Sequence, residues 1–253
     1  MDRQEKKQAK TTIKKVGSRK KLEQSAQIPP RNPMWNIWQV LFLILVVSLI
    51  EWPLGWLESP DTLDTLTGFF RYLAMGMGDA GLYLLLLYFL FRLIRRPFSD
   101  MGFVRPRLAQ VVLGLFMGFI LFVGISLLGN LMADLLGEPE PQSFALAVEG
   151  VEYGWQFIFL LILGGIIAPL KEEAIFRGLV YPPLRNTHGK LKGILLTGLF
   201  FAVLHFDYIR FLPLFLGGVI LAWMYERTAS LWPSIIAHGA WNMLMAMALW
   251  LQP

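Results

Sequence analysis

Two adjacent carboxylates, Glu172 and Glu173, follow an apolar stretch at residues 157–170, and a basic side chain follows them at Arg177. On a helix, the two glutamates point about 100° apart. Glu173 and Arg177 are spaced i,i+4 with the acid first, which is the better order for an ion pair. We therefore expect Glu173 to pair with Arg177. This pairing leaves Glu172 as an unpaired carboxylate that can act as a general acid or base.

Two imidazoles and an amide lie within other apolar stretches of the chain, at His205, His238 and Asn242. Glu172 and His205 stand nearly equally far before and after the loop around residue 188, so an antiparallel helix pair brings them to a similar depth. His238 and Asn242 are spaced i,i+4 and share one helix face. A count of residues from the start of its helix near Ser230 predicts a shallower position for His238, which helix tilt or a re-entrant start could correct.

This set of side chains is suited to the hydrolysis of an amide. Glu172 and His205 can hold and deprotonate a water, while His238 and Asn242 can donate hydrogen bonds to the oxyanion that forms. Glu172, His205 and His238 could instead bind zinc with one open position. Asn242 favours the metal-free form, because neutral amides are poor zinc ligands and good oxyanion donors.

Each of these side chains also has a structural interpretation when it is taken alone. His205, His238 and Asn242 are residue types that form hydrogen bonds between transmembrane helices. The pair of Glu173 and Arg177 is more often structural than catalytic. Their joint presence in one small membrane protein favours a common site.

The composition predicts an all-α, polytopic transmembrane helical bundle. The 253 residues are 55% hydrophobic and 16% charged, whereas soluble domains average about 25% charged residues. The chain has no cysteine, which excludes disulfides and thiolate chemistry. About seven spanning helices are expected, at residues 34–50, 69–93, 108–136, 153–181, 191–206, 211–225 and 231–251. Asp79, among glycines, is interpreted as a feature of a helix start rather than part of the site.

Residues 1–33 differ from the remainder, because they are polar and rich in lysine and arginine. We expect a disordered basic tail on the cytoplasmic face, in contact with anionic lipid, before a membrane domain at 34–253. Nucleic acid is not an expected partner. The loops after the first and third expected helices are acidic, and those after the second and fourth are basic. This alternation predicts a cytoplasmic N-terminus.

Three short motifs carry a resemblance to a known family. They are Glu172-Glu173-x-x-x-Arg177, Phe201-x-x-x-His205 and His238-x-x-x-Asn242. In this order they resemble the motifs of the CPBP family of intramembrane proteases, which includes the CAAX prenyl endopeptidase and Abi-type bacteriocin-immunity proteins. The resemblance covers about residues 98–242, and the segment 98–103 is similar to the family's pre-helix segment.

The resemblance implies an all-α membrane fold with a site open toward the cytoplasmic side. It implies that Glu172 and His205 activate water and that His238 and Asn242 stabilise the oxyanion, with Glu173, Arg177 and Phe201 in support. Family members are commonly labelled metalloproteases, and a metal-free, glutamate-based mechanism is also proposed for them. We favour no metal, with zinc as the alternative cofactor.

We therefore predict an integral-membrane endopeptidase that cleaves a peptide or a membrane-associated protein near the cytoplasmic interface. The first alternative is a non-proteolytic immunity or scaffold protein, whose partner capture would survive Glu172→Ala. The second is a small proton-coupled transporter with Glu172 and His205 as a relay, which proton-dependent uptake into liposomes would reveal. The compact size indicates a bacterial plasma membrane, where a prenylated substrate is not expected.

Overall fold

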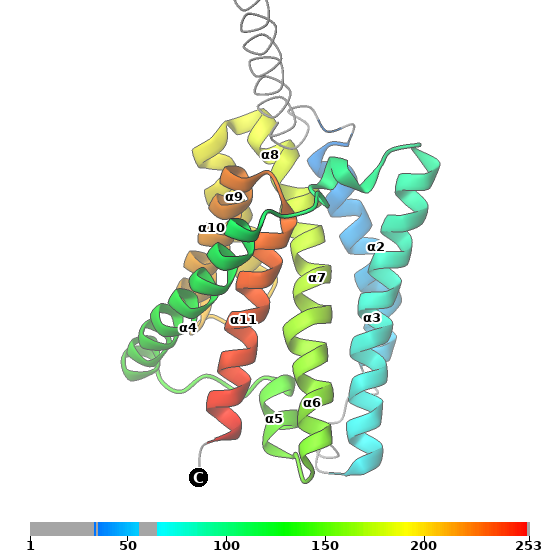
Figure 1. Ribbon diagram of the computed structural model, residues 1–253. Coiled ribbons are helices and arrows are strands. Elements are labelled where there is room, and N and C mark those ends of the chain that lie inside the picture. Colours follow the sequence, from blue (N-terminus) through cyan, green and yellow to red (C-terminus); the bar gives the residue numbers. More distant parts are fainter. Residues whose placement is uncertain (1–32, 34, 56–64, 252–253) are drawn as a thin grey trace, which may run out of the picture.

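The computed structural model describes residue 33 and residues 35–55 and 65–251. All regular elements in this part of the chain are helices (Figure 1), so the predicted all-α class is confirmed. The expected disordered tail, at residues 1–33, lies almost wholly outside the described residues, as does most of the acidic loop after the first helix.

Within the described residues, six long helices are separate from one another. They are α2 (Ile37–Gly55), α3 (Leu66–Leu93), α4 (Leu108–Leu136), α9 (Lys190–Val203), α10 (Phe211–Thr228) and α11 (Leu231–Trp250). A seventh helical stretch runs without a break through α6 (Gly154–Ile162), a π-helical segment (Leu163–Ile167), α7 (Ala168–Glu173), a second π-helical segment (Ala174–Val180) and α8 (Tyr181–His188). The bounds predicted for α4 match, and most others differ by a few residues.

Two differences from the predicted elements concern short segments. A two-turn helix, α5 (Ser143–Glu149), lies in the acidic segment that was expected to be a loop. The fifth expected helix ends early, because α9 stops at Val203 and the chain turns at Phe206, whose φ is +51°. His205 therefore lies in the turn after α9 and not in the helix.

The π-helical segments on both sides of α7 set the rotation of its side chains. A π-helical turn adds a residue to the turn, and such turns are frequent at functional sites. Pro169, in the first turn of α7, lacks an N–H and cannot donate to a carbonyl of the preceding turn. The side chains of the six residues of α7 are therefore rotated about the helix axis, relative to the directions that an uninterrupted α-helix would give them.

Glycines allow the helices around α7 to approach closely. A Cβ atom on Gly118 of α4 would lie 2.7 Å from the carbonyl oxygen of Ala237 in α11. A Cβ atom on Gly218 of α10 would lie 2.9 Å from the Cα of Gly198 in α9. Close backbone contact at small residues is typical of helices packed in a membrane. The first contact packs α11 on α4, the second packs α10 on α9, and α11 lies between α4 and α7 (Figure 1).

The lengths and composition of two helices fit a membrane span. Within the described residues, α3 and α4 are long and apolar enough to cross a bilayer, and 22% of the apolar window of each is buried inside the protein. A shorter apolar helix covers Ile37–Ile50. Most of α3 and α4 therefore faces outward, as expected of helices that contact lipid.

A polar cluster around Glu226 joins the ends of three helices just beyond the apolar stretch of α10. Its carboxylate accepts hydrogen bonds from Tyr181 Oη (2.8 Å) and Arg185 Nε (2.7 Å), and Lys190 Nζ lies 3.0 Å away. Burial would raise the pKa of Glu226, but hydrogen bonds from Arg185, Lys190 and Tyr181 outweigh it and lower the pKa to about 2. The cluster ties α8, α9 and α10 together above the site.

Candidate active site

Glu173 is the centre of the polar network between α7 and α11. It is fully buried, and its Oε1 accepts a hydrogen bond from Arg177 Nη1 at 2.7 Å, so the predicted ion pair is confirmed. The same oxygen lies 2.9 Å from His238 Nδ1, a contact that the sequence reasoning did not anticipate. Glu173 therefore holds an arginine of its own helix and a histidine of another.

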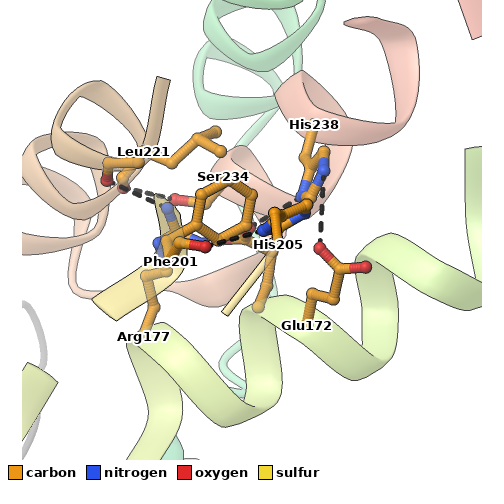
Figure 2. A network of polar contacts seen from close by, with 9 residues as sticks. Glu172, Arg177, Phe201, His205, Leu221, Ser234 and His238 are labelled. Carbon is orange, nitrogen blue, oxygen red and sulfur yellow. Dashed lines mark hydrogen bonds and ion pairs between the residues drawn. The ribbon is translucent and has the colours of Figure 1, made fainter. Parts of the chain in front are cut away.

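His238 lies between the two adjacent glutamates. Its Nδ1 contacts Glu173, and its Nε2 lies 3.8 Å from Glu172 Oε2, as the dashed line in Figure 2 marks. Because an ionised carboxylate only accepts, the proton between His238 and Glu173 belongs to Nδ1. The imidazole is thus fixed in orientation, with its second nitrogen directed at Glu172.

The predicted shallow position of His238 is wrong. It reaches Glu172 and Glu173, so the three side chains lie at one depth. The count along the chain assumed straight helices up to residue 188, but the chain turns after α7 and α8 crosses the top of the bundle (Figure 1). A Cβ atom on Gly239 would lie 2.2 Å from the carbonyl oxygen of Gly165, so α11 packs directly on the π-helical segment at this level.

Glu172 is the most accessible charged group of this network. Its side chain is 22% exposed, compared with 0% for Glu173 and 4% for His238. Its partner within the described residues is His238, at the long distance of 3.8 Å, and no lysine or arginine of the described residues forms an ion pair with it. Glu173 is thus paired as predicted, whereas Glu172, which was predicted to be unpaired, has a long contact with His238.

His205 is oriented by its own helix end. Its Nδ1 lies 2.6 Å from the carbonyl oxygen of Phe201, which can only accept, so Nδ1 carries the proton and Nε2 is left free. The rings of His205 and His238 both pack on Phe201, with centroid distances of 4.6 Å and 5.7 Å. Phe201 thus brings the two imidazoles to one place (Figure 2). No hydrogen bond or ion pair within the described chain joins His205 to Glu172.

Arg177 supports this arrangement from the helical turn that follows α7. Its guanidinium is fully buried, donates to Glu173 and to the carbonyl oxygen of Gly218 at 2.9 Å, and lies 5.0 Å from the ring centroid of Phe201. One cation therefore contacts α7, α9 and α10. Such a buried charge is tolerated only with these compensating contacts.

Asn242 makes a hydrogen bond between helices. Its Nδ2 donates to the carbonyl oxygen of Gly164 at 2.9 Å. That oxygen lies in the first π-helical segment, where the N–H of Ala168 bonds to Leu163 and the next residue, Pro169, has no N–H. Asn242 therefore satisfies a carbonyl that the helix leaves without its usual donor. Its role as an oxyanion donor stays a prediction.

The fit of the site to a metal ion can be tested on the placement of its donors. Across the described residues, no three histidine, aspartate or glutamate side chains lie close enough to hold a metal ion together. Glu172, His205 and His238, the predicted zinc ligands, do not form such a group as they are placed. The zinc alternative therefore finds no ready ligand set, and we derive no step through a metal.

A second ion pair, which is partly buried, was missed by the sequence reasoning. Lys171 Nζ contacts Asp79 Oδ2 of α3 and lies 5.5 Å from the ring centroid of Tyr83. Asp79 and Tyr83 are i,i+4 and present one face of α3 to α7. Asp79 lies well inside α3, so its interpretation as a helix-start feature is wrong. The sequence did contain a signal for this pair, because Asp79 and Lys171 are an acid and a base within otherwise apolar stretches.

Comparisons with known proteins agree with these motifs. Residues 154–244 match the family model described as "Type II CAAX prenyl endopeptidase Rce1-like". YdiL of Bacillus subtilis (strain 168), provisionally named a membrane peptidase, is 29% identical over 33% of this chain and 34% of its own. The UPF0177 protein YxdF of Lactococcus lactis subsp. lactis (strain IL1403) is 30% identical over 34% of this chain and 47% of its own.

A longer match has a less informative name. An uncharacterized 24.3 kDa protein of Escherichia coli is 28% identical over 66% of this chain and 76% of its own. The matches to YdiL and YxdF span less than half of the length of those two proteins. No solved structure matches the chain. The segment that the family model matches, residues 154–244, contains α6 to α10, most of α11 and all the polar residues of the network around Glu173.

Proposed function

We propose that this chain is a member of the CPBP family of CAAX-type membrane proteases, whose family model matches residues 154–244, and that it is an intramembrane endopeptidase. It hydrolyses a peptide bond of a peptide or of a membrane-associated protein. Glu172 and His205 activate water, and His238 and Asn242 stabilise the oxyanion. The observation that carries the proposal is the contrast between a paired, buried Glu173 and a largely unpaired, partly exposed Glu172 beside an oriented His238.

The proposed first step uses the free atoms of Glu172 and His205. A water held by the Glu172 carboxylate and by His205 Nε2 gives a proton to Glu172 as its oxygen attacks the scissile carbonyl carbon. A tetrahedral oxyanion forms. When it collapses, the carbon–nitrogen bond breaks, and Glu172 returns the proton to the amine that leaves.

The oxyanion requires hydrogen-bond donors near the attacked carbonyl. Asn242 has a second amide N–H besides the one that it gives to Gly164. His238 Nε2 is an acceptor in the neutral ring, because Nδ1 carries the proton that contacts Glu173. His238 therefore donates to the oxyanion only when its ring holds a second proton. Glu172, 3.8 Å from Nε2, is the nearest carboxyl group to share one.

We propose a bacterial plasma membrane as the location, with the N-terminus in the cytoplasm and the site toward that side. The basic residues after α3 and around Lys190 support this orientation, because cytoplasmic loops are enriched in lysine and arginine. Single cysteines can be labelled without interference, since the chain has none. A cysteine placed at Ser18 should react with an impermeant reagent in inverted vesicles only, and labelling from outside the cell would reverse the orientation.

The decisive test of the proposed activity compares membrane peptides from cells with the intact protein and with Glu172→Gln. Peptide products should vanish in the variant, while the amount of folded protein stays near normal. Glu149→Gln is the matched control, because Glu149 is an exposed glutamate of α5 outside the network. If the intact protein, Glu172→Gln and Glu149→Gln give the same peptides, the proposed proteolysis is wrong.

A further inference from the structure

The end of α3 forms a basic cavity that the proposed hydrolysis does not use. The cavity has a volume of about 540 Å³ and is lined by Phe91, Arg92, Arg95, Arg96 and Pro97. Three of the five lining residues are arginines, and none of the five is acidic. A cavity of this size can enclose a small molecule or a lipid headgroup. Its arginine lining favours a negatively charged ligand.

Two of the three arginines keep their charge available. Arg96 Nε is paired with Asp100 Oδ2 at 2.8 Å. Neither Arg92 nor Arg95 takes part in an ion pair with another described residue, and both are exposed. The cavity therefore holds about two uncompensated positive charges. Guanidinium groups in this number bind a phosphate through several charge-assisted hydrogen bonds.

Arg95 has a backbone conformation that is energetically unfavourable for a residue other than glycine. The N–H of Arg95 bonds to the carbonyl of Arg92, and the N–H of Arg96 bonds to the carbonyl of Phe91, the pattern that commonly closes a helix with a left-handed residue. That residue is Arg95, with φ of +53°, where glycine is the favoured type. The closing turn alone does not require an arginine, so its side chain needs a separate explanation.

Aromatic residues indicate that the cavity lies at the membrane surface. Phe91, which forms its inner wall, packs on Trp35 at 5.5 Å and on Phe98 at 5.4 Å between ring centroids. Phe98 contacts Phe103, and Phe103 contacts Trp232. A band of aromatic side chains with tryptophans is typical of the interface between hydrocarbon and headgroups. The arginines lie at the end of α3 beside this band.

An apolar stripe leads from the cavity along α3. Leu85, Phe89 and Leu93 are 52%, 59% and 80% exposed. Leu85 and Phe89 are spaced i,i+4, and Arg92 continues the same face at i+7, with Leu93 beside it, while Arg96 follows just beyond the end of the helix. One side of a helix that is long enough to span a bilayer thus carries apolar side chains below and arginines above.

We propose that this cavity and stripe bind one anionic phospholipid, with its phosphate among Arg92, Arg95 and Arg96 and its acyl chains along Leu85, Phe89 and Leu93. A zwitterionic lipid has the same phosphate, but its ammonium group would face the same arginines. The apolar stripe favours a lipid over a free phosphate as the ligand, because inorganic phosphate has no apolar part that could bind along it. This proposal stands independently of the proposed protease activity.

The test uses the full chain, purified in a mild detergent and titrated with dioleoyl phosphatidylglycerol, with the bound fraction read by native mass spectrometry. Dioleoyl phosphatidylcholine and inorganic phosphate are titrated in parallel. Removing both free charges in the double variant Arg92→Gln and Arg95→Gln should weaken phosphatidylglycerol binding about 25-fold, since each basic side chain near an anionic surface contributes about fivefold. Phe89→Ser should weaken lipid binding and leave phosphate binding unchanged.

Two further variants separate a specific site from general effects. Arg105→Gln with Arg107→Gln removes the same charge from the same loop outside the cavity, and it should change lipid binding less than about twofold. Arg95→Gly should keep or raise the unfolding temperature, because glycine suits its backbone, and should still lose lipid. Equal losses in the two double variants, equal binding of both lipids, or displacement by inorganic phosphate with no effect of Phe89→Ser would each overturn the proposal.

Discussion

His238 Nε2 lies 3.8 Å from Glu172 Oε2, while Nδ1 of the same ring is held 2.9 Å from Glu173 Oε1. One imidazole therefore touches both members of an adjacent glutamate pair, and the pair is divided into a buried anchor and an accessible carboxylate. This division is what the proposed mechanism needs, because the anchor fixes the ring and the accessible carboxylate is free to take a proton from water.

Arg177→Ala should lower the yield of folded protein. The substitution leaves Glu173 buried without its cation, and breaking a buried pair costs about 3–5 kcal/mol. The measurement is the folded fraction in detergent by size-exclusion chromatography, together with the unfolding temperature. Arg227→Ala is the control, because Arg227 is exposed and its described contact is a ring of its own helix, Trp223. Normal folding of Arg177→Ala would contradict the anchoring role of Glu173.

Asn242→Ala distinguishes an oxyanion donor from an interhelical contact. If Asn242 is an oxyanion donor, Asn242→Ala should lower turnover about 10²–10³-fold, with little change in substrate affinity. As a contact alone, its loss leaves Gly164 O unsatisfied and lowers stability with turnover per folded molecule unchanged. Turnover and unfolding temperature are measured on the same preparation, with a substrate identified from the peptide comparison. Unchanged turnover would remove Asn242 from the catalytic set.

Metal content can be measured directly by elemental analysis of the purified protein. We predict no stoichiometric zinc and activity that survives chelation, because Glu172, His205 and His238 do not lie together as a ligand group. A zinc site would instead bring these three side chains within about 2.0–2.2 Å of one ion. One zinc per chain, lost together with activity in His205→Ala, would make them ligands and reverse the prediction.

Asp79→Asn and Lys171→Met should each destabilise the protein, because each leaves the other partner charged between two apolar helices. The exchanged pair, Asp79→Lys with Lys171→Asp, should recover part of the stability, since it restores opposite charges at the same contact. The unfolding temperatures of the unaltered protein, the two single variants and the double variant Asp79→Asn with Lys171→Met give the coupling as a double-mutant cycle. Additive effects, with no recovery in the exchanged pair, would show that the contact carries no coupling.

Stability should fall in acid through Glu226. Its pKa is lowered from 4.5 to about 2 in the folded protein, so its contribution is complete above its ordinary pKa and is lost as the pH falls toward the folded value. Glu226→Gln should be less stable than the unaltered protein at pH 7 and should approach it in stability near pH 2–3. Unfolding temperatures over this range check the sign. A constant difference between the two proteins would exclude Glu226 as the titrating group.

The sequence by itself determined the features that depend on near neighbours in the chain. The bounds of α4 follow from one long, mostly apolar stretch between a basic and a Gly-containing segment. The pair of Glu173 and Arg177 follows from the i,i+4 spacing of one helix. Both depend on the fixed geometry of a helical turn, which the order of residues alone specifies.

The contacts between helices were decided only by the tertiary structure. His238 meets Glu173, Asn242 meets Gly164, and Lys171 meets Asp79 across distant parts of the chain. Each contact depends on the rotation and depth of two helices. The π-helical turns beside α7 shift its register, and each added residue turns a helix face by about 100°. Counting residues along straight helices cannot supply that rotation, and packing at Gly239 and Gly118 sets it.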